Sequence, residues 1–260
     1  MTIHSAIGPG SPIPQMNIAG VDVASLAWDD AIALLKGVLL SRHFTKVAFL
    51  NAHNSNVAHA DPRLRSALDG ALVLPDGVGV DIAAKLLYGR PFAANLNGTD
   101  FVPALARAVE KPLRVGLLGA KRANVEAAAA GLARIAPQHA YLVVGDGYFD
   151  AGDEAALLAR MAEMRLDLLL AALGTPRQEI FVAEKVGSEH APVSISVGAL
   201  FDFLAGAVPR APEWVRRARL EWVFRLILEP GRLWRRYLLG NPRFLFHVMQ
   251  QKLRLGRTQT

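Results

Sequence analysis

The sequence predicts an α/β fold: a Rossmann-like, mostly parallel sheet with helices on both faces, followed by a basic helical appendage. Three observations support this prediction. Short, continuous apolar runs alternate with longer segments of helical periodicity. The chain has 260 residues, of which 52% are hydrophobic, so a full core is available. Its positive charge gathers near the C-terminus.

Continuous apolar runs are typical of parallel strands, because such strands are buried on both faces. The runs that we expect to form strands lie at 17–23, 46–50, 71–74, 114–118, 140–144, 167–173 and 193–197.

The segments between these runs carry apolar residues at helical spacing. The expected helices lie at 25–40, 63–68, 80–87, 100–109, 124–135, 154–164, from about 176, and at 213–228. Ser25 is expected to cap the first helix, with Asp29 and Asp30 in its opening turn. Thr99 or Asp100 is expected to cap the helix at 100–109.

Charge divides the chain into unlike parts. The formal net charge is +6, but the part from Arg210 onward has 12 Lys/Arg and 3 Asp/Glu, so the preceding part is acidic. We therefore expect a flexible lead at 1–16, an α/β domain at 17–209 that carries the catalytic residues, and a basic amphipathic appendage at 210–260. Such a tail suits binding to a phosphate or an anionic surface.

Composition also excludes some classes of protein. The chain has no cysteine, which excludes disulfides and thiolate metal sites. Residues 1–15 lack a signal-peptide pattern, and no run approaches the roughly 20 apolar residues of a membrane span, so we expect a cytosolic protein, free or peripherally attached. The histidines have no metal-ligand spacing, so no metal or other cofactor is expected.

Polar residues follow several predicted strands, at the carboxyl ends where ligands bind in such sheets. Asn51 and His53 follow one strand, Asp76 follows the next, and Gly174 follows a later one. These residues are expected to line one edge of the sheet. Together with Asp100, we take Asn51, His53 and Gly174 as candidate substrate-binding residues.

Asp76 lies in the sequence Pro75-Asp76-Gly77, directly after a buried run. A carboxylate there can act as a general base for a hydroxyl nucleophile that a substrate brings within hydrogen-bond reach. Alternatively, Asp76 caps the following helix. The residues alone leave both interpretations open.

Gln178 lies in the first turn of a helix that begins near Pro176. Its amide can hydrogen-bond sugar hydroxyls or a nucleobase. An ordinary helix start explains the same residues equally well. Lys121 follows a glycine turn near another helix start, but the surrounding sequence is neither GxGxxG nor a Walker A motif, so the phosphate signal is weak.

The appendage mixes arginines with aromatic residues. It contains Arg225, Arg232, Arg235 and Arg236 among Trp222, Phe224, Trp234 and Tyr237. Three interpretations compete: a solvated helical face, a membrane-surface helix, and a diphosphate clamp. The excess of arginine over lysine favours bidentate phosphate recognition.

Several motifs occur in order along the chain. They are Pro75-Asp76-Gly77, Gly174-Thr-Pro-Arg-Gln178-Glu179, Phe201-Asp202-Phe203-Leu204-Ala-Gly206, Arg210-Ala-Pro212, and Glu221-Trp222-x-x-Arg225 through Glu229-Pro230-x-Arg232-x-x-Arg235-Arg236-Tyr237. With these motifs, the sequence resembles the WecG/TagA/CpsF glycosyltransferases, glycosyltransferase family 26. The resemblance extends from about residue 17 to residue 244.

The resemblance implies an inverting, metal-independent transfer of a sugar from a UDP-sugar to a polyprenyl-diphosphate-linked saccharide, in bacterial cell-surface or exopolysaccharide biosynthesis. It puts the catalytic aspartate at Asp76, the active-site glutamine at Gln178, and diphosphate-binding arginines at Arg225, Arg232 and Arg235.

The resemblance also implies a location at the cytoplasmic face of the inner membrane. The appendage is expected to complete the active site and to contact an anionic membrane surface. A homo-oligomer with the tail displaced is expected in the absence of ligands.

One stretch departs from the family pattern. Members often carry T-x-N-x-E after the second strand, where this chain has Phe49, Asn51 and His53. Only the asparagine is retained. The donor sugar therefore stays open between N-acetylmannosamine, N-acetylmannosaminuronic acid and a glucose-type donor.

Two other functions compete with this one. A nucleotide-binding oxidoreductase would suit the sheet, but GxGxxG is missing. A module that binds nucleic acid through its basic tail would leave the acidic body and the polar strand ends without a task. We therefore expect no nucleic-acid partner.

Overall fold

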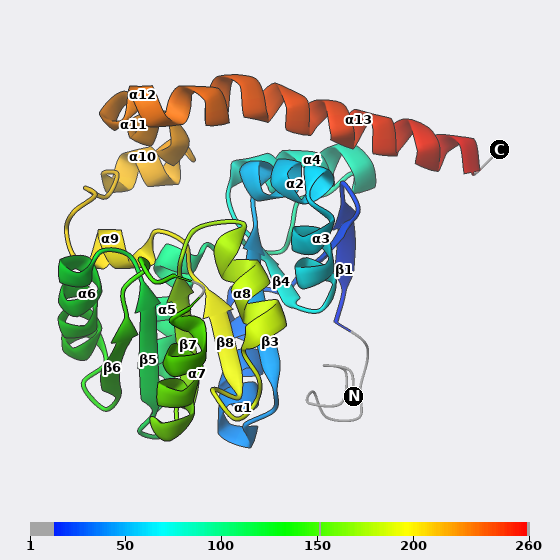
Figure 1. The fold of residues 1–260 in the computed structure, drawn as a ribbon. Helices are drawn as coiled ribbons and strands as arrows, with labels where there is room; N and C mark the ends of the chain where they lie inside the picture. Colours follow the sequence, from blue (N-terminus) through cyan, green and yellow to red (C-terminus); the bar gives the residue numbers. More distant parts are fainter. Residues whose placement is uncertain (1–12, 151, 259–260) are drawn as a thin grey trace.

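The fold is described here from a computed structural model, which covers residues 13–150 and 152–258 (Figure 1). Its centre is a six-stranded sheet in the order β4-β3-β8-β7-β5-β6, with every neighbouring pair parallel. The strands are β3 (Thr45–Leu50), β4 (Leu72–Pro75), β5 (Arg114–Gly119), β6 (Ala140–Gly145), β7 (Leu168–Ala172) and β8 (Val193–Ser196). The predicted α/β class is confirmed.

Helices cover both faces of the sheet, because successive residues of a strand point to opposite sides. Val47 and Phe49 of β3 pack with helices on one face, which are α1 (Trp28–Ser41), α5 (Gly98–Ala108) and α6 (Arg122–Ile135). Ala48 and Leu50 pack on the other face, with α2 (Ala52–Ala60), α3 (Pro62–Asp69) and α4 (Val78–Tyr88). Further along that face lie α7 (Glu154–Glu163) and α8 (Arg177–Lys185).

The predicted single strand at 17–23 is wrong, because this segment forms a two-stranded hairpin. β1 (Gln15–Ile18) pairs antiparallel with β2 (Val21–Ala24), and Ala19 and Gly20 turn the chain with φ angles of 49° and 89°. Residues 1–12 of the expected flexible lead lie outside the described residues. Residues 15 and 16 of that lead belong to β1, which begins at Gln15.

Two predicted helix caps are also wrong. Ala27, rather than Ser25, precedes α1, and it forms no side-chain cap. The side chain of Asn97 caps α5 by accepting a hydrogen bond of 3.0 Å from the N–H of Asp100, so neither Thr99 nor Asp100 is the cap. Both errors arise because several residue types suited to capping stand close together, and composition does not say which of them the backbone uses.

After β8, the chain leaves the sheet and crosses its carboxyl end (Figure 1). Its elements are α9 (Leu200–Leu204), α10 (Glu213–Arg217), α11 (Glu221–Leu228), α12 (Pro230–Trp234), the π-helical segment η2 (Arg235–Leu239) and α13 (Gly240–Thr258). The predicted helix at 213–228 is broken between α10 and α11, where Arg219 has a φ of 59°. We call residues 210–239 the strap.

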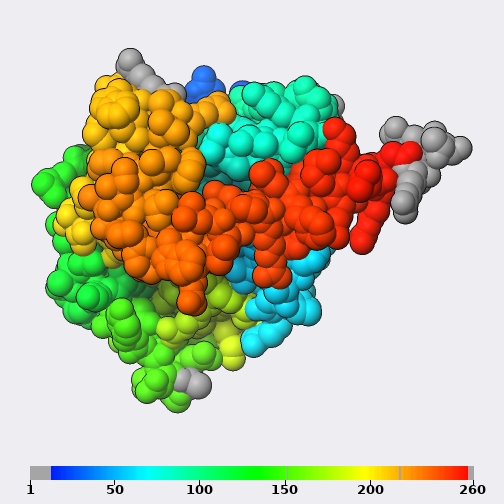
Figure 2. Space-filling model, turned by 90° about the horizontal axis from the view of Figure 1, so that it is seen from above, coloured from blue at the N-terminus to red at the C-terminus, as the bar shows by residue number. Residues whose placement is uncertain are grey.

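The strap is tied to the body by ion pairs. Arg210 pairs with Asp100 of α5, and Nη1 of Arg219 donates to Oδ2 of Asp81 in α4 at 2.7 Å. Asp81 is only 4% exposed, and its Oδ1 has no hydrogen-bond partner, so Arg219 supplies its charge compensation. Seen from above, the orange strap covers the middle of this end of the molecule (Figure 2).

The helix α13 is held more firmly than the strap. Phe244 and Val248 are buried against α2, α4 and the hairpin. Nδ2 of Asn56 donates to the carbonyl of Gly240 at 2.7 Å, and Nε2 of Gln251 donates to the Asn17 carbonyl at 2.9 Å. The part of α13 from Gly240 to Gln251 is therefore part of the packed domain. None of the helices within 13–150 and 152–258 is long and apolar enough to cross a membrane.

Candidate active site

The carboxyl ends of the central strands lie beneath the strap (Figure 1). Because β3 lies between β4 and β8, Asn51 and His53 after β3 are placed between Asp76 after β4 and Gly198 after β8. This edge is where a doubly covered parallel sheet binds its ligands. The strand-end residues expected from the sequence therefore share one edge.

The turn that carries Asp76 is fixed by its neighbours. The Asp76 N–H donates to the Leu50 carbonyl of β3 at 2.9 Å, and the N–H of Leu96 donates to the Pro75 carbonyl at 2.9 Å. Gly77, with a φ of 90°, precedes α4 and forms no side-chain cap. The carboxyl of Asp76 accepts from Asn51 instead, so the interpretation of Asp76 as a helix cap is not supported.

Burial and charge act on Asp76 in opposite directions. Burial is the largest influence and raises the pKa of the carboxyl above its ordinary value of 3.8. The hydrogen bond from Asn51 and the charges of Arg236 and Arg225 lower the pKa. The result is a carboxylate more basic than a solvated aspartate, which suits a group that accepts a proton.

Asn51 has two tasks. Its Oδ1 accepts from the N–H groups of His53 and Asn54, each at 3.0 Å, and so caps α2. Its Nδ2 donates to Oδ2 of Asp76 at 3.1 Å. One amide therefore starts the helix after β3 and orients the carboxyl after β4.

His53 stands in the first turn of α2, partly buried. Burial, followed by the nearby charge of Arg236, lowers its pKa to about 4. The imidazole is therefore neutral at pH 7. In that state one ring nitrogen can donate a hydrogen bond and the other can accept one.

Gln178 is 2% exposed and fully engaged within the fold. Its Oε1 accepts from the N–H of Gly198 at 3.2 Å, and its Nε2 donates to Glu179 at 2.8 Å. Glu179 also accepts from Thr175, and burial raises its pKa. Gln178 thus joins the turn after β7 to the turn after β8, directly behind the strand-end edge.

Gly174 and Asp100 have different settings. Gly174 turns the chain after β7 with a φ of 78°, a conformation that favours glycine. Asp100 lies in the first turn of α5, where it accepts from Nδ2 of Asn97 at 3.1 Å and pairs with Arg210 of the strap. In this structure Asp100 anchors the strap.

The arginines of the strap fall into two groups. Arg225 and Arg236 are partly buried, and their charges lower the pKa of Asp76. Arg232 and Arg235 are exposed; Arg232 pairs with Glu229, and the guanidinium of Arg235 lies 5.3 Å from the ring centroid of Trp234. Of the three arginines expected at the diphosphate, the structure therefore brings Arg225 toward Asp76.

Sequence reasoning missed two groups near this edge. One is Arg236, which was recognised only as part of the arginine-rich tail. The other is Glu221 at the start of α11, whose pKa is raised by burial and then by the charge of Asp76. Nothing in the local sequence distinguishes either from its neighbours, because their positions depend on how the strap crosses the sheet.

Phe49 occupies the position where related sequences often have threonine, and it faces the core. It is 6% exposed, and a Cβ added at Gly98 would lie 3.0 Å from its ring. The ring therefore packs closely under the start of α5. In this chain, the side chain of Phe49 fills space between β3 and α5.

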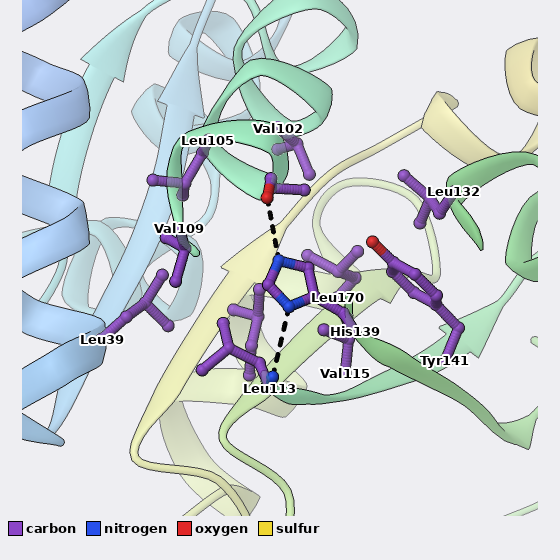
Figure 3. A pocket seen from close by; sticks show the side chains of 12 residues that line it. Leu39, Val102, Leu105, Val109, Leu113, Val115, Leu132, His139, Tyr141 and Leu170 are labelled. Atoms are coloured by element: carbon purple, nitrogen blue, oxygen red, sulfur yellow. Dashed lines mark hydrogen bonds between the residues drawn. The ribbon is translucent and has the colours of Figure 1, made fainter. Parts of the chain in front are cut away.

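A separate small cavity lies between α5 and the sheet (Figure 3). Its volume is about 10 Å³, and its walls are mostly apolar. His139 bridges it through the Leu113 N–H at 3.2 Å and the Ala106 carbonyl at 2.8 Å. The space holds at most one water, so it is a packing defect rather than a substrate site.

In the described part of the chain, no group of three or more His, Asp or Glu side chains stands close enough to hold a metal ion. The polar edge beneath the strap consists of carboxylates, amides, guanidinium groups and the imidazole of His53.

The sequence of the chain matches a known protein family. The glycosyl transferase WecG/TagA/CpsF family matches residues 16–258, nearly the whole chain. The chain belongs to this family. The expected family is therefore confirmed, and the protein is a glycosyltransferase.

Two relatives in this glycosyltransferase family share the name N-acetylglucosaminyldiphosphoundecaprenol N-acetyl-beta-D-mannosaminyltransferase. The chain is 30% identical over 246 residues to the protein of Bacillus spizizenii, which covers 93% of this chain and 91% of the relative. It is 31% identical over 210 residues to that of Bacillus subtilis (strain 168), with 79% of this chain and 80% of the relative covered.

Proposed function

We propose that this glycosyltransferase moves a sugar from a UDP-sugar to a polyprenyl-diphosphate-linked saccharide with inversion at the anomeric carbon. The observation that carries the proposal is a partly buried carboxyl at Asp76 whose pKa is raised by burial and is under the influence of the charges of Arg236 and Arg225 from the strap. The relatives' names, which specify a diphosphoundecaprenol acceptor and a β-linked product, support the same reaction.

In the proposed step, Asp76 accepts the proton of the acceptor hydroxyl as its oxygen bonds to the anomeric carbon. The bond from that carbon to the UDP oxygen breaks, and the electron pair leaves with UDP. Asn51 holds the carboxyl in place through the hydrogen bond of 3.1 Å. The guanidinium groups stabilise the charge that develops on the diphosphate.

In this proposal, the other candidate residues bind the substrates or hold the site in shape. His53 would be a neutral hydrogen-bonding group beside the donor sugar. Gln178 and Gly174 would shape the floor of the site between β7 and β8. Asp100 would act through Arg210 by holding the strap closed.

The resemblance also assigns Arg232 and Arg235 to diphosphate binding. Arg232 is paired with Glu229 through an Nε to Oε2 distance of 2.6 Å, and both arginines are exposed. In this proposal they form the outer rim of the site, where they attract the donor and the acceptor diphosphate. An exposed, paired arginine contributes less than a desolvated one.

The strap also presents apolar side chains to solvent. Trp214 is 70% exposed, Ile227 is 73% exposed, and Leu239 is 58% exposed. Interleaved with arginines, such residues suit an anionic membrane surface. We propose peripheral attachment at the cytoplasmic face of the inner membrane, where a lipid-linked acceptor would be reached. A homo-oligomer with a displaced strap remains a prediction.

The test of the reaction is a transfer assay with a panel of UDP-sugars and a polyprenyl-diphosphate N-acetylglucosamine acceptor. The panel contains UDP-N-acetylmannosamine, UDP-N-acetylmannosaminuronic acid and UDP-glucose, each with and without EDTA. We expect one donor to give a β-linked product in EDTA. A product with retained configuration, or turnover that stops in EDTA, would contradict the inverting, metal-independent mechanism.

A further inference from the structure

Glu179 is a buried acid at a position where the usual structural reason for a glutamate is missing. It is the third residue of α8, and it is 4% exposed. A glutamate at this position of a helix commonly turns back and accepts from the N–H of the residue that precedes the helix. Here that residue is Pro176, which has no N–H. The carboxyl of Glu179 therefore serves other donors.

Two side chains of the turn after β7 donate to Glu179. Its Oε1 accepts from Oγ1 of Thr175 at 2.9 Å and from Nε2 of Gln178 at 2.8 Å. Its Oε2 is shielded from solvent and has no hydrogen-bond partner within 13–150 and 152–258. A carboxyl withdrawn from water with one oxygen unpartnered costs free energy. The two hydrogen bonds at Oε1 are therefore what this carboxyl contributes.

The carboxyl determines which way the amide of Gln178 points. A glutamine amide has one end that accepts and one end that donates, and a flip exchanges the two. Because a carboxylate only accepts, Glu179 requires the NH2 end of the amide. The carbonyl end then faces the other way, where it accepts from the N–H of Gly198 at 3.2 Å.

The turn at Gly198 is part of the edge where the candidate site lies. Gly198 follows β8, which lies between β3 and β7, and its φ of 56° is a conformation that favours glycine. From this turn the chain enters α9, where the ring centroid of Phe203 lies 5.4 Å from the guanidinium of Arg225 in the strap. The amide of Gln178 therefore holds a turn that leads from the sheet edge to the strap.

The start of α8 also holds the loop after β6. Arg177 donates to the carbonyls of Gly147 and Phe149 at 2.6 and 2.9 Å, and its guanidinium lies 4.4 Å from the ring centroid of Phe149. Thr175, which donates to Glu179, lies two residues before Arg177. Glu179 is thus placed where the turns after β6, β7 and β8 are tied together.

We propose that Glu179 is a positioning residue for the glycosyl transfer: it orients the amide of Gln178, which in turn holds the Gly198 turn at the substrate site. This inference rests on the proposed function. Glu179 is assigned no contact with a substrate, and its whole effect on the reaction passes through Gln178. The rate should therefore depend on Glu179 only while Gln178 is present.

The test is a double-mutant cycle on the full-length chain, measured as transfer from the preferred UDP-sugar to the lipid-diphosphate acceptor. The proteins are the wild type, Glu179→Met, Gln178→Ala and the variant with both changes. Methionine has about the length of glutamate but is only a weak acceptor. We expect Glu179→Met to lower kcat about 10- to 100-fold. In the Gln178→Ala background, the same change should alter kcat by less than about threefold.

The matched control is Glu184→Gln, since Glu184 lies on the same helix, has a side chain that is 41% exposed, and pairs with Arg63. We expect its kcat to stay within about twofold of the wild-type value. Glu179→Gln keeps one acceptor oxygen, so it should recover part of the rate that Glu179→Met loses. Thermal melting checks each fold. If Glu179→Met is not folded, Glu179→Asp takes its place in the cycle, because it keeps the carboxylate on a shorter side chain.

Hydrogen exchange at the amide of Gly198 gives a second readout, which does not depend on the reaction. The N–H of Gly198 loses its oriented acceptor when the amide of Gln178 is released. Exchange should therefore be faster in Glu179→Met than in the wild type, and unchanged in Glu184→Gln.

Equal losses of kcat in both backgrounds would show that Glu179 supports the fold in general, which would overturn the proposal. A folded Glu179→Met with kcat within about threefold of the wild type would overturn it as well. If the wild type transfers no sugar from any donor in the panel, the proposed function is wrong. Exchange at Gly198 then decides alone, and an unchanged rate in Glu179→Met would show that Glu179 does not orient Gln178.

Discussion

At the scale of single residues, the carboxyl of Asp76 shows how a site can work against stability. Burial raises its pKa in the folded chain above the ordinary value of 3.8. When folding raises the pKa of a carboxyl, the protonated group favours the folded chain. This contribution to stability is fully present at pH values below the pKa in the unfolded chain, and it is lost as the pH rises through the pKa in the folded chain. At neutral pH, ionised Asp76 therefore lowers the stability of the fold, and the proposed function requires this ionised form.

Replacing Asp76 tests this balance. We expect Asp76→Asn to melt at a higher temperature than the wild type at pH 7 to 8, because the amide carries no buried charge. The difference should shrink as the pH falls through the raised pKa of the wild-type carboxyl, because the carboxyl then becomes protonated. Differential scanning fluorimetry across this range measures it.

The matched control is Asp69→Asn, since the side chain of Asp69 is 61% exposed. We expect no pH-dependent gain in that variant. Equal behaviour of the two variants would show that Asp76 is not held in a charge-disfavouring site.

Asn51 offers a second test, because its two tasks can be separated. Asn51→Ser keeps an oxygen that can cap α2, but its shorter side chain does not reach Asp76 as the amide does, whereas Asn51→Ala loses both interactions. The acid limb of kcat/KM should move to higher pH in both variants, since removing the donor raises the pKa of Asp76. Only Asn51→Ala should also lose about 1 kcal/mol of stability from the missing cap.

Steady-state rates between pH 4 and pH 8 and urea denaturation provide the two measurements. An unshifted acid limb in both variants would mean that a group other than Asp76 sets the pH dependence.

The sequence was sufficient to place Asp76, Asn51 and His53 at one edge, because carboxyl ends of parallel strands converge in every such sheet. It was not sufficient to predict that Arg236 is partly buried while Arg235 is exposed. Both residues lie in a π-helical segment, which has no sequence signal as strong as an apolar run.

At the scale of elements, α13 joins the packed domain and the exposed surface. Phe244 is 1% exposed, and Phe246, two residues later, is 60% exposed. Phe244→Ala should destabilise the protein by about 3–5 kcal/mol because it leaves a cavity among α2, α4 and α13. Phe246→Ala should change stability by no more than about 0.5 kcal/mol.

Urea denaturation followed by circular dichroism compares the two variants. Similar small losses would show that α13 rests on the domain without being part of its core.

Other elements show why sequence patterns predict some helices and strands correctly and miss others. The six strands of the main sheet were predicted because their runs are apolar on both faces. The helix α2 was missed, since its sequence AHNSNVAHA is mostly polar and its order comes from the Asn51 cap and from packing against α13. The segment at 213–228 has continuous helical periodicity, but Arg219 leaves the helix to reach buried Asp81.

At the scale of the whole molecule, the acidic body and the basic strap form a polarised protein. Its exposed apolar residues on the strap predict binding to vesicles with anionic lipid, weakened by salt and weaker still for zwitterionic vesicles. Ile227→Ser combined with Leu239→Ser should reduce flotation with anionic vesicles severalfold.

The control for flotation is Phe44→Ser, since Phe44 is 41% exposed and precedes β3 at the opposite end of the sheet. We expect it to float like the wild type. Equal flotation of all three proteins would argue against the strap as the membrane-facing surface.

The proposed glycosyl transfer requires Asp76 as the base. The most direct measurement compares single-turnover transfer by the wild type and by Asp76→Asn, with the preferred UDP-sugar and the lipid-diphosphate acceptor, after UDP binding by both has been established. We predict a rate about 10²- to 10⁴-fold lower for Asp76→Asn with UDP affinity retained. A near-normal rate for that variant would contradict the assignment of Asp76 and the mechanism built on it.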